Sequence, residues 1–176
     1  MKGILKAYVR FSNAVVSIGG YVAGILIFLI SVMVFYEIVA RSVFNAPTIW
    51  ANELSVYALI GSGLLGAGYT LVGDGHIRVD VVLERVSDRT SRILHTFTYF
   101  LGLIFALVLL IYGVELVAKT YLIGLTSASL LRVPMYIPYL LIPVGSTILV
   151  LAFIQKIITT LNPELNPHSE KKGGAN

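Results

Sequence analysis

The chain has 176 residues, of which 57% are hydrophobic and 12% are charged, and its formal net charge is +4. Soluble domains carry about 25% charged residues, so this composition excludes a soluble domain with an ordinary polar surface. The chain contains no cysteine, which excludes disulfides, thiolate catalysis and cysteine-ligated metals. The modest positive charge is typical of membrane topology and does not indicate nucleic-acid binding.

Four apolar runs contain no Asp, Glu, Lys or Arg: residues 13–36, 54–73, 93–114 and 133–155. Each run is close to or above the roughly 20 residues that a membrane-spanning helix needs. The runs are continuous rather than alternating, which argues against a barrel. We therefore predict an all-α integral membrane protein with four transmembrane helices. Residues 1–161 should form one membrane domain, and residues 162–176 a disordered cytoplasmic tail.

The first run follows three cations but is too long for the apolar region of a signal peptide. We expect it to remain as the first helix. It contains Gly20 and Gly24 one turn apart, and the second run carries small residues at a spacing of four: Ala58, Ser62, Gly66 and Thr70. Small side chains let helix backbones approach closely in lipid. These stripes predict close packing, either within the bundle or against a helix of another subunit.

Polar residues are concentrated between the first two runs. Glu37 and Arg41 have the i, i+4 spacing of a helical ion pair. Pro47 should turn the chain, and Trp50 should anchor it at the membrane interface. Glu53 should open the second helix at the positive end of its dipole. Helix-end chemistry explains most of this pattern, and a contact with a partner protein is the more specific interpretation.

The link between the second and third runs begins with the turn signal Asp74-Gly75-His76. Apolar residues then recur with helical spacing: Val79, Val82, Leu83 and Val86. This pattern predicts a short amphipathic helix in the membrane interface. We expect it to brace the chain against lipid headgroups or another subunit, and a plain connector is the alternative. The residues assigned to the brace are His76, Arg78, Asp80, Arg85 and Arg89.

The three histidines, His76, His95 and His168, do not have the spacing of metal ligands. No paired histidines suggest haem either, so we expect no cofactor. In the fourth run, Pro143 should kink the helix or end a turn. Pro134 and Pro138 bracket the start of that helix.

Ten of the thirteen cations lie on one side of the predicted membrane domain, in the N-terminal segment, the link after the second run and the C-terminal tail. Cytoplasmic segments carry the excess of Lys and Arg. Both termini are therefore expected in the cytoplasm. Interfacial aromatic residues gather on the opposite side, which supports this orientation: Tyr36, Phe44, Trp50, Tyr121, Tyr136 and Tyr139.

Three motifs occur in a characteristic order: E-x-x-x-R-x-x-F-x-x-P-x-x-W-x-x-E from Glu37, G-H-I-x-V-D from Gly75, and P-x-Y-I-P-Y-x-x-x-P-x-G from Pro134. Together they resemble the small membrane subunit of tripartite ATP-independent periplasmic (TRAP) transporters. The resemblance covers roughly residues 10–160. Tyr136 stands where many members of the family have tryptophan, and it keeps an aromatic ring at the interface.

The resemblance implies a non-catalytic scaffold subunit of a sodium-driven importer of an organic acid, of the C4-dicarboxylate or sialic acid type. Such a subunit packs against a large translocating subunit in the bacterial inner membrane, among its lipids, and helps to receive a periplasmic substrate-binding protein. The residues agree with this role, because translocation sites usually contain intramembrane charges or broken helices. The four runs contain no such charge.

Two other classes remain open on sequence grounds. A small homo-oligomeric transporter would need a coupling acid, for which Glu37 is the nearest candidate. A membrane enzyme or cytochrome subunit would need paired histidines or an acid–base set within the spans. For a scaffold, the candidate partner contacts are Glu37, Arg41, Asn45, Trp50, Glu53 and Arg132. Among these we expect Arg41, Asn45 and Arg132 to meet the binding protein.

Overall fold

The structure is a computed structural model that describes residues 2–73 and 88–165. Its long helices are α1 (Lys2–Phe44), α2 (Ile49–Val72), α4 (Asp88–Ile123) and α6 (Leu141–Leu161). A short helix, α5 (Tyr136–Tyr139), precedes α6, and a 3-10 turn, η1 (Pro163–Leu165), follows it. Within these described residues, four helices are long and apolar enough to cross a membrane. The predicted all-α membrane fold is confirmed.

The predicted interfacial helix lies outside the described residues, together with His76, Arg78, Asp80 and Arg85. Arg89 falls in the first turn of α4. Of the predicted tail, the structure describes residues 162–165, and Pro163–Leu165 form η1. Glu164 in η1 forms a 3.2 Å ion pair with Lys2 at the start of α1. Both side chains are exposed, so this pair contributes little to stability.

The helices extend beyond the charge-free runs that predicted them. The first run has 24 residues, whereas α1 has 43 residues, which corresponds to about 65 Å at 1.5 Å per residue. The hydrocarbon core is only about 30 Å thick. Charged side chains end the part of a helix that lipid can cover, but they do not interrupt its backbone hydrogen bonds. Part of α1 must therefore continue outside the hydrocarbon core.

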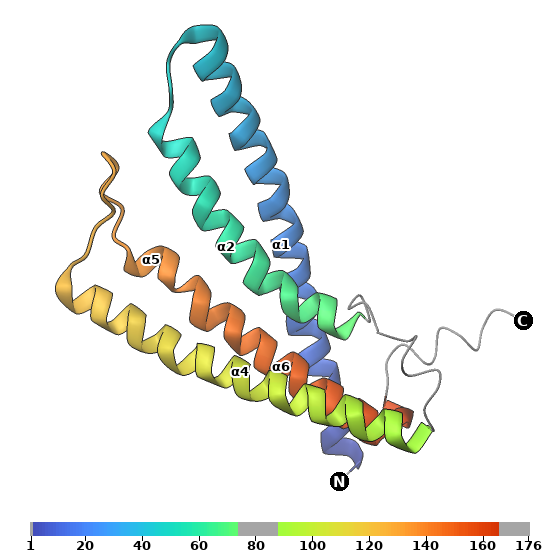
Figure 1. Ribbon diagram of the computed structural model, residues 1–176. Coiled ribbons are helices and arrows are strands. Elements are labelled where there is room, and N and C mark those ends of the chain that lie inside the picture. The colour runs from blue at the N-terminus through green and yellow to red at the C-terminus, as the bar shows by residue number, and fades with distance from the viewer. Residues whose placement is uncertain (1, 74–87, 166–176) are drawn as a thin grey trace, which may run out of the picture.

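The four long helices form two hairpins. In the first hairpin α1 packs along α2, and in the second hairpin α4 packs along α5 and α6. The hairpins are joined because α6 contacts both α2 and α1. Figure 1 shows them meeting near the start of α1 and spreading apart toward the turn at 45–48 and the loop at 124–135. We call this second end of the molecule the loop end.

Small residues set the distance between the two hairpins. A Cβ atom added to Gly145 on α6 would lie 2.5 Å from the Cβ of Leu64 on α2, and one added to Gly68 would lie 3.0 Å from Ile148. Larger residues fill the core around this crossing: Val16, Leu65, Leu71, Val72, Ile148 and Leu149. The helices α2 and α6, which cross at the centre, can therefore approach closely because Gly68 and Gly145 have no side chain.

The glycine stripe of α1 divides into two environments. A Cβ added to Gly20 would meet the ring of Tyr69 at 2.4 Å, whereas one added to Gly24 would meet nothing within 4 Å. On α2, Ser62 is buried, and a Cβ on Gly66 would lie 3.3 Å from the Cβ of Ala23. Gly20, Ser62 and Gly66 therefore face neighbours in this chain, and Gly24 faces open space.

The outer helices α1 and α4 keep most of their apolar surface uncovered. Only 6% of the most apolar window of α1 and 11% of that of α4 are buried, against 39% for α2 and for α6. On α4 the buried positions recur every seven residues, at Ala106, Gly113 and Thr120. This spacing makes a narrow seam against α6, so the other faces of α4 are left for lipid or another protein.

The start of the fourth span is interrupted where the prolines predict. Leu140 separates α5 from α6, and Pro143 lies in the first turn of α6. Proline has no N–H group, so the carbonyl of Tyr139 receives no hydrogen bond from position 143. The missing bond accounts for the break one turn before Pro143.

Candidate functional site

The candidate partner contacts chosen from the sequence all lie at the loop end, on α1, on α2 or in the adjoining segments. Two of these residues, Glu37 and Glu53, have carboxylates that bond to other residues of this chain. Glu37 is on the last turns of α1, and Glu53 follows the first turn of α2, so it does not open the helix as the sequence predicted. Each carboxylate accepts hydrogen bonds from a different segment of the chain.

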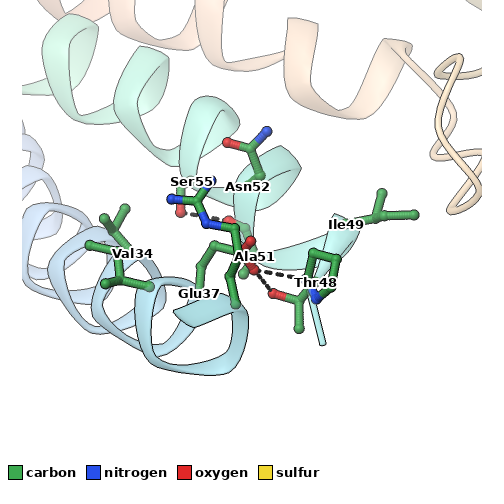
Figure 2. A pocket seen from close by; sticks show the side chains of 10 residues that line it. Val34, Glu37, Thr48, Ile49, Ala51, Asn52 and Ser55 are labelled. Atoms are coloured by element: carbon green, nitrogen blue, oxygen red, sulfur yellow. Dashed lines mark hydrogen bonds between the residues drawn. The ribbon is translucent and has the colours of Figure 1, made fainter. Parts of the chain in front are cut away.

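The Glu37 carboxylate ties the end of α1 to the start of α2. Its Oε2 atom accepts a 2.8 Å hydrogen bond from the backbone N–H of Thr48 and another from the Thr48 hydroxyl. Figure 2 shows both bonds. No direct ion pair joins Glu37 to Arg41 in the part of the chain that the structure describes. The pairing expected from their spacing is therefore replaced by a bond across the turn, because Thr48 offers two donors to one oxygen.

Asn45 ends α1 through its backbone. Its φ of 50° lies in the left-handed region, which asparagine tolerates better than most residues. The chain then turns so that the N–H of Ala46 donates a 3.0 Å hydrogen bond to the carbonyl of Ala40. Asparagine is a common residue at helix C-termini. Asn45 is thus explained by local backbone geometry without a partner.

Arg132 has a similar backbone in the loop before α5. Its φ is 46°, and its N–H donates a 3.2 Å hydrogen bond to the carbonyl of Ser129. Arginine has no special preference for this conformation. The side chain is exposed and lines an open hollow of about 600 Å³ with Ile49 and residues 126–130. A cation is therefore held on a tight turn at the surface.

The Glu53 carboxylate joins the two hairpins. It accepts one hydrogen bond from the hydroxyl of Tyr57, one turn along α2, and another from the hydroxyl of Ser129 in the loop at 124–135. Tyr57 also reaches the Sδ atom of Met135 at 3.5 Å. Ser129 and Tyr57 were not among the residues predicted from the sequence. The i, i+4 spacing of Glu53 and Tyr57 was a usable signal, whereas Ser129 is 76 residues away from Glu53.

A groove of about 510 Å³ opens between α1 and α2 at the loop end. Figure 2 shows it with side chains from both helices around it. The lining residues are Val34, Glu37, Ile38, Arg41, Pro47, Thr48, Ile49, Ala51, Asn52 and Ser55. The rings of Tyr36 and Trp50 lie 5.5 Å apart at the same end of the hairpin. Trp50 thus pairs with an aromatic ring of α1.

The chemistry of the loop end is that of helix termini and connecting turns. Both carboxylates accept hydrogen bonds from residues of the same chain. Within residues 2–73 and 88–165, no three His, Asp or Glu side chains are placed to hold a metal ion. The arrangement can fix the two hairpins relative to each other and can present exposed cations. It therefore suits a surface for partners or lipids.

Known proteins match the chain over most of its length. The family model for the DctQ component of tripartite ATP-independent periplasmic transporters matches residues 30–162. The C4-dicarboxylate TRAP transporter small permease protein DctQ of Rhodobacter capsulatus is 28% identical over 107 residues, which are 61% of this chain and 47% of the relative. The matched region thus spans about half the length of that relative. The resemblance found in the sequence is confirmed: this chain belongs to the DctQ family, the small permease component of TRAP transporters.

Proposed function

We propose that this chain is the non-catalytic scaffold subunit of a sodium-driven TRAP transporter that imports an organic acid. The name of the Rhodobacter relative refers to C4-dicarboxylates, so this is the solute class we propose first, before sialic acids. The chain packs against the large translocating subunit and helps to receive the periplasmic binding protein. The excess of cations in the N-terminal segment, the link between the second and third spans and the C-terminal tail supports an inner-membrane orientation with both termini in the cytoplasm.

One observation carries the scaffold role: apolar surface is left open on α1 and α4, while charged groups stay at the helix ends. A translocating protein would place polar or broken segments near mid-membrane. Here the helix break at Leu140 lies close to the loop end, and the ion pair of Glu115 with Lys119 lies near the end of α4. The open apolar faces fit a protein that attaches to another membrane subunit.

The first test is uptake by reconstituted subunits. We expect labelled C4-dicarboxylate to enter vesicles only when this chain, the large subunit and the binding protein are all present with an inward sodium gradient. Replacing sodium with potassium should abolish uptake, which controls for leakage. This chain should also co-purify with the large subunit in mild detergent. Uptake by vesicles that contain this chain alone would contradict the scaffold role and favour the homo-oligomeric transporter.

The second test concerns Arg132 as a contact for the binding protein. Arg132→Glu should raise the concentration of binding protein needed for half-maximal uptake by on the order of threefold, because reversing a rim charge slows association. The maximal rate should stay unchanged. Arg132→Gly keeps the left-handed backbone accessible and removes only the side chain, so it should give a smaller increase.

The matched control for Arg132 is Lys119→Glu. Lys119 is also an exposed cation, but it is paired with Glu115 at 2.6 Å and does not line the hollow beside Arg132. Lys119→Glu should leave the concentration of binding protein needed for half-maximal uptake unchanged. If Arg132→Glu and the unmodified chain need the same concentration of binding protein for half-maximal uptake, Arg132 does not contact the binding protein.

A further inference from the structure

The groove between α1 and α2 changes from apolar to polar along the helix axis. Val34 and Ile38 line one part of it, and Arg41 and Asn52 line another. Val34 and Arg41 are seven residues apart on α1, which corresponds to about 10 Å along the axis. The groove therefore offers apolar contacts to one part of an occupant and hydrogen-bond donors to another part. An amphiphile matches this gradient.

The groove also lies at the level where a membrane changes from hydrocarbon to headgroups. The charge-free run of α1 ends at Tyr36, and Glu37 begins the polar end. The Tyr36 and Trp50 rings pair there and are 49% and 40% exposed. Such half-exposed rings are enriched at the headgroup level. Val34 then lies on the hydrocarbon side of this level, and Arg41 lies on the headgroup side.

Both signs of charge line the groove without cancelling each other directly. Arg41 and Glu37 are both lining residues, yet no ion pair joins them within the described chain. The first turn of α2 adds positive potential, because its N-cap residue, Thr48, makes no side-chain bond to its own helix. A cationic and an anionic group side by side are complementary to a zwitterion.

We propose that this groove binds one phospholipid with a phosphoethanolamine headgroup. The phosphate contacts Arg41 and Asn52, and the primary ammonium faces the Glu37 carboxylate. One acyl chain follows Ile38 and Val34 toward the middle of the membrane. A primary ammonium can donate hydrogen bonds to a carboxylate, whereas a glycerol headgroup carries no cation. A protein helix would have to place charged groups over Arg41 and Glu37 at the headgroup level, so lipid is the favoured occupant.

The test is retention of lipid by the purified transporter complex. The complex is incubated in nanodiscs of phosphatidylethanolamine and phosphatidylglycerol, transferred to detergent, washed, and analysed by native mass spectrometry. The unmodified complex should retain one phosphatidylethanolamine molecule. The Arg41→Gln complex should retain it on the order of tenfold less well. Lys119→Gln, which removes another exposed cation away from the groove, should retain it fully. Equal retention by Arg41→Gln and the unmodified complex would overturn the proposal.

A photoreactive side chain tests the site without removing a charge. Benzoylphenylalanine in place of Ile38 should crosslink to phosphatidylethanolamine in the assembled complex. A crosslink to a protein subunit instead would show that the groove is a protein interface and would overturn the proposal. Equal capture of phosphatidylglycerol would overturn the headgroup assignment, since Glu37 would then select nothing. The variant with benzoylphenylalanine at position 38 keeps Arg41. It therefore still tests whether lipid occupies the groove if the Arg41→Gln complex fails to assemble.

Discussion

Replacing Gly145 with leucine should separate the two hairpins and prevent stable assembly of the bundle. The Cβ of alanine at this position would already lie 2.5 Å from the Cβ and 3.1 Å from the backbone carbonyl carbon of Leu64. No rotation of the Leu64 side chain can relieve a contact with its backbone. Overpacking in a tight core costs about 1–3 kcal/mol, so Gly145→Ala should be destabilised and Gly145→Leu should be affected more severely.

The measurement is unfolding of the purified chain in detergent, followed by loss of helical circular dichroism as sodium dodecyl sulfate is added. Gly63→Ala is the matched control, because a Cβ at Gly63 on α2 would meet nothing within 4 Å. Alanine is favoured over glycine inside helices by about 1 kcal/mol, so this variant should be at least as stable as the unmodified chain. If Gly145→Ala and Gly63→Ala unfold at the same concentration of sodium dodecyl sulfate, α2 and α6 do not cross as closely as the structure shows.

Gly24→Ala separates the two interpretations of the glycine stripe. Gly24 faces open space within this chain, so the isolated variant should be at least as stable as the unmodified chain, as for Gly63→Ala. If another subunit packs on Gly24, the same substitution should reduce co-purification with the large subunit. The comparison therefore shows whether the stripe serves packing within the bundle alone.

The four helices were predictable because lipid leaves few alternatives. A backbone in hydrocarbon must satisfy its own hydrogen bonds, and a charge-free run of sufficient length therefore becomes a helix. The helix ends were not predictable in the same way. Hydropathy marks the part that lipid covers, whereas α1 continues to Phe44 through Glu37 and Arg41. Its end depends on the left-handed backbone of Asn45.

The stripe of small residues on α2 illustrates a second limit. A spacing of four residues advances about 40° beyond a full turn at each step, since a helix has 3.6 residues per turn. The stripe from Ala58 to Thr70 therefore drifts around the helix. Ala58 and Ser62 are buried, but Thr70 is exposed, and Gly68 and Leu71 take the buried positions. The four-residue spacing therefore predicted the packing face of α2 correctly for about two turns and incorrectly beyond them.

The bonds at the loop end depend on tertiary structure that sequence spacing does not contain. Glu37 has Arg41 at a favourable spacing, yet its carboxylate binds Thr48 across the turn. Glu53 has one partner at a helical spacing and another, Ser129, in a loop of the other hairpin. The second partner follows from how the hairpins meet. The sequence therefore located the polar residues at the correct end but did not pair them correctly.

Replacing Glu53 with alanine should detach the loop at 124–135 from α2. Glu53 accepts hydrogen bonds from Tyr57 and Ser129, so one substitution removes both. We expect amide hydrogen exchange in this loop to become on the order of tenfold faster, because the local opening equilibrium sets exchange. Dicarboxylate uptake by the full transporter should fall if the loop helps to receive the binding protein. Glu115→Ala, which removes an exposed carboxylate on α4, should leave exchange in the loop unchanged.

A double-mutant cycle distinguishes a lost bond from a general disturbance. Ser129→Ala removes the loop hydroxyl that Glu53 binds, together with the bonds of that hydroxyl to Ser127 and to the N–H of Leu131, and it should also speed exchange in the loop. The effect of the double variant should be smaller than the product of the two single effects, because both substitutions remove the bond that Glu53 and Ser129 share. Multiplicative effects of the two substitutions would show that Glu53 and Ser129 act independently, and the carboxylate would then not join the hairpins. Non-additive effects would instead identify Glu53 as the residue that holds the loop of the second hairpin against α2 in the first hairpin.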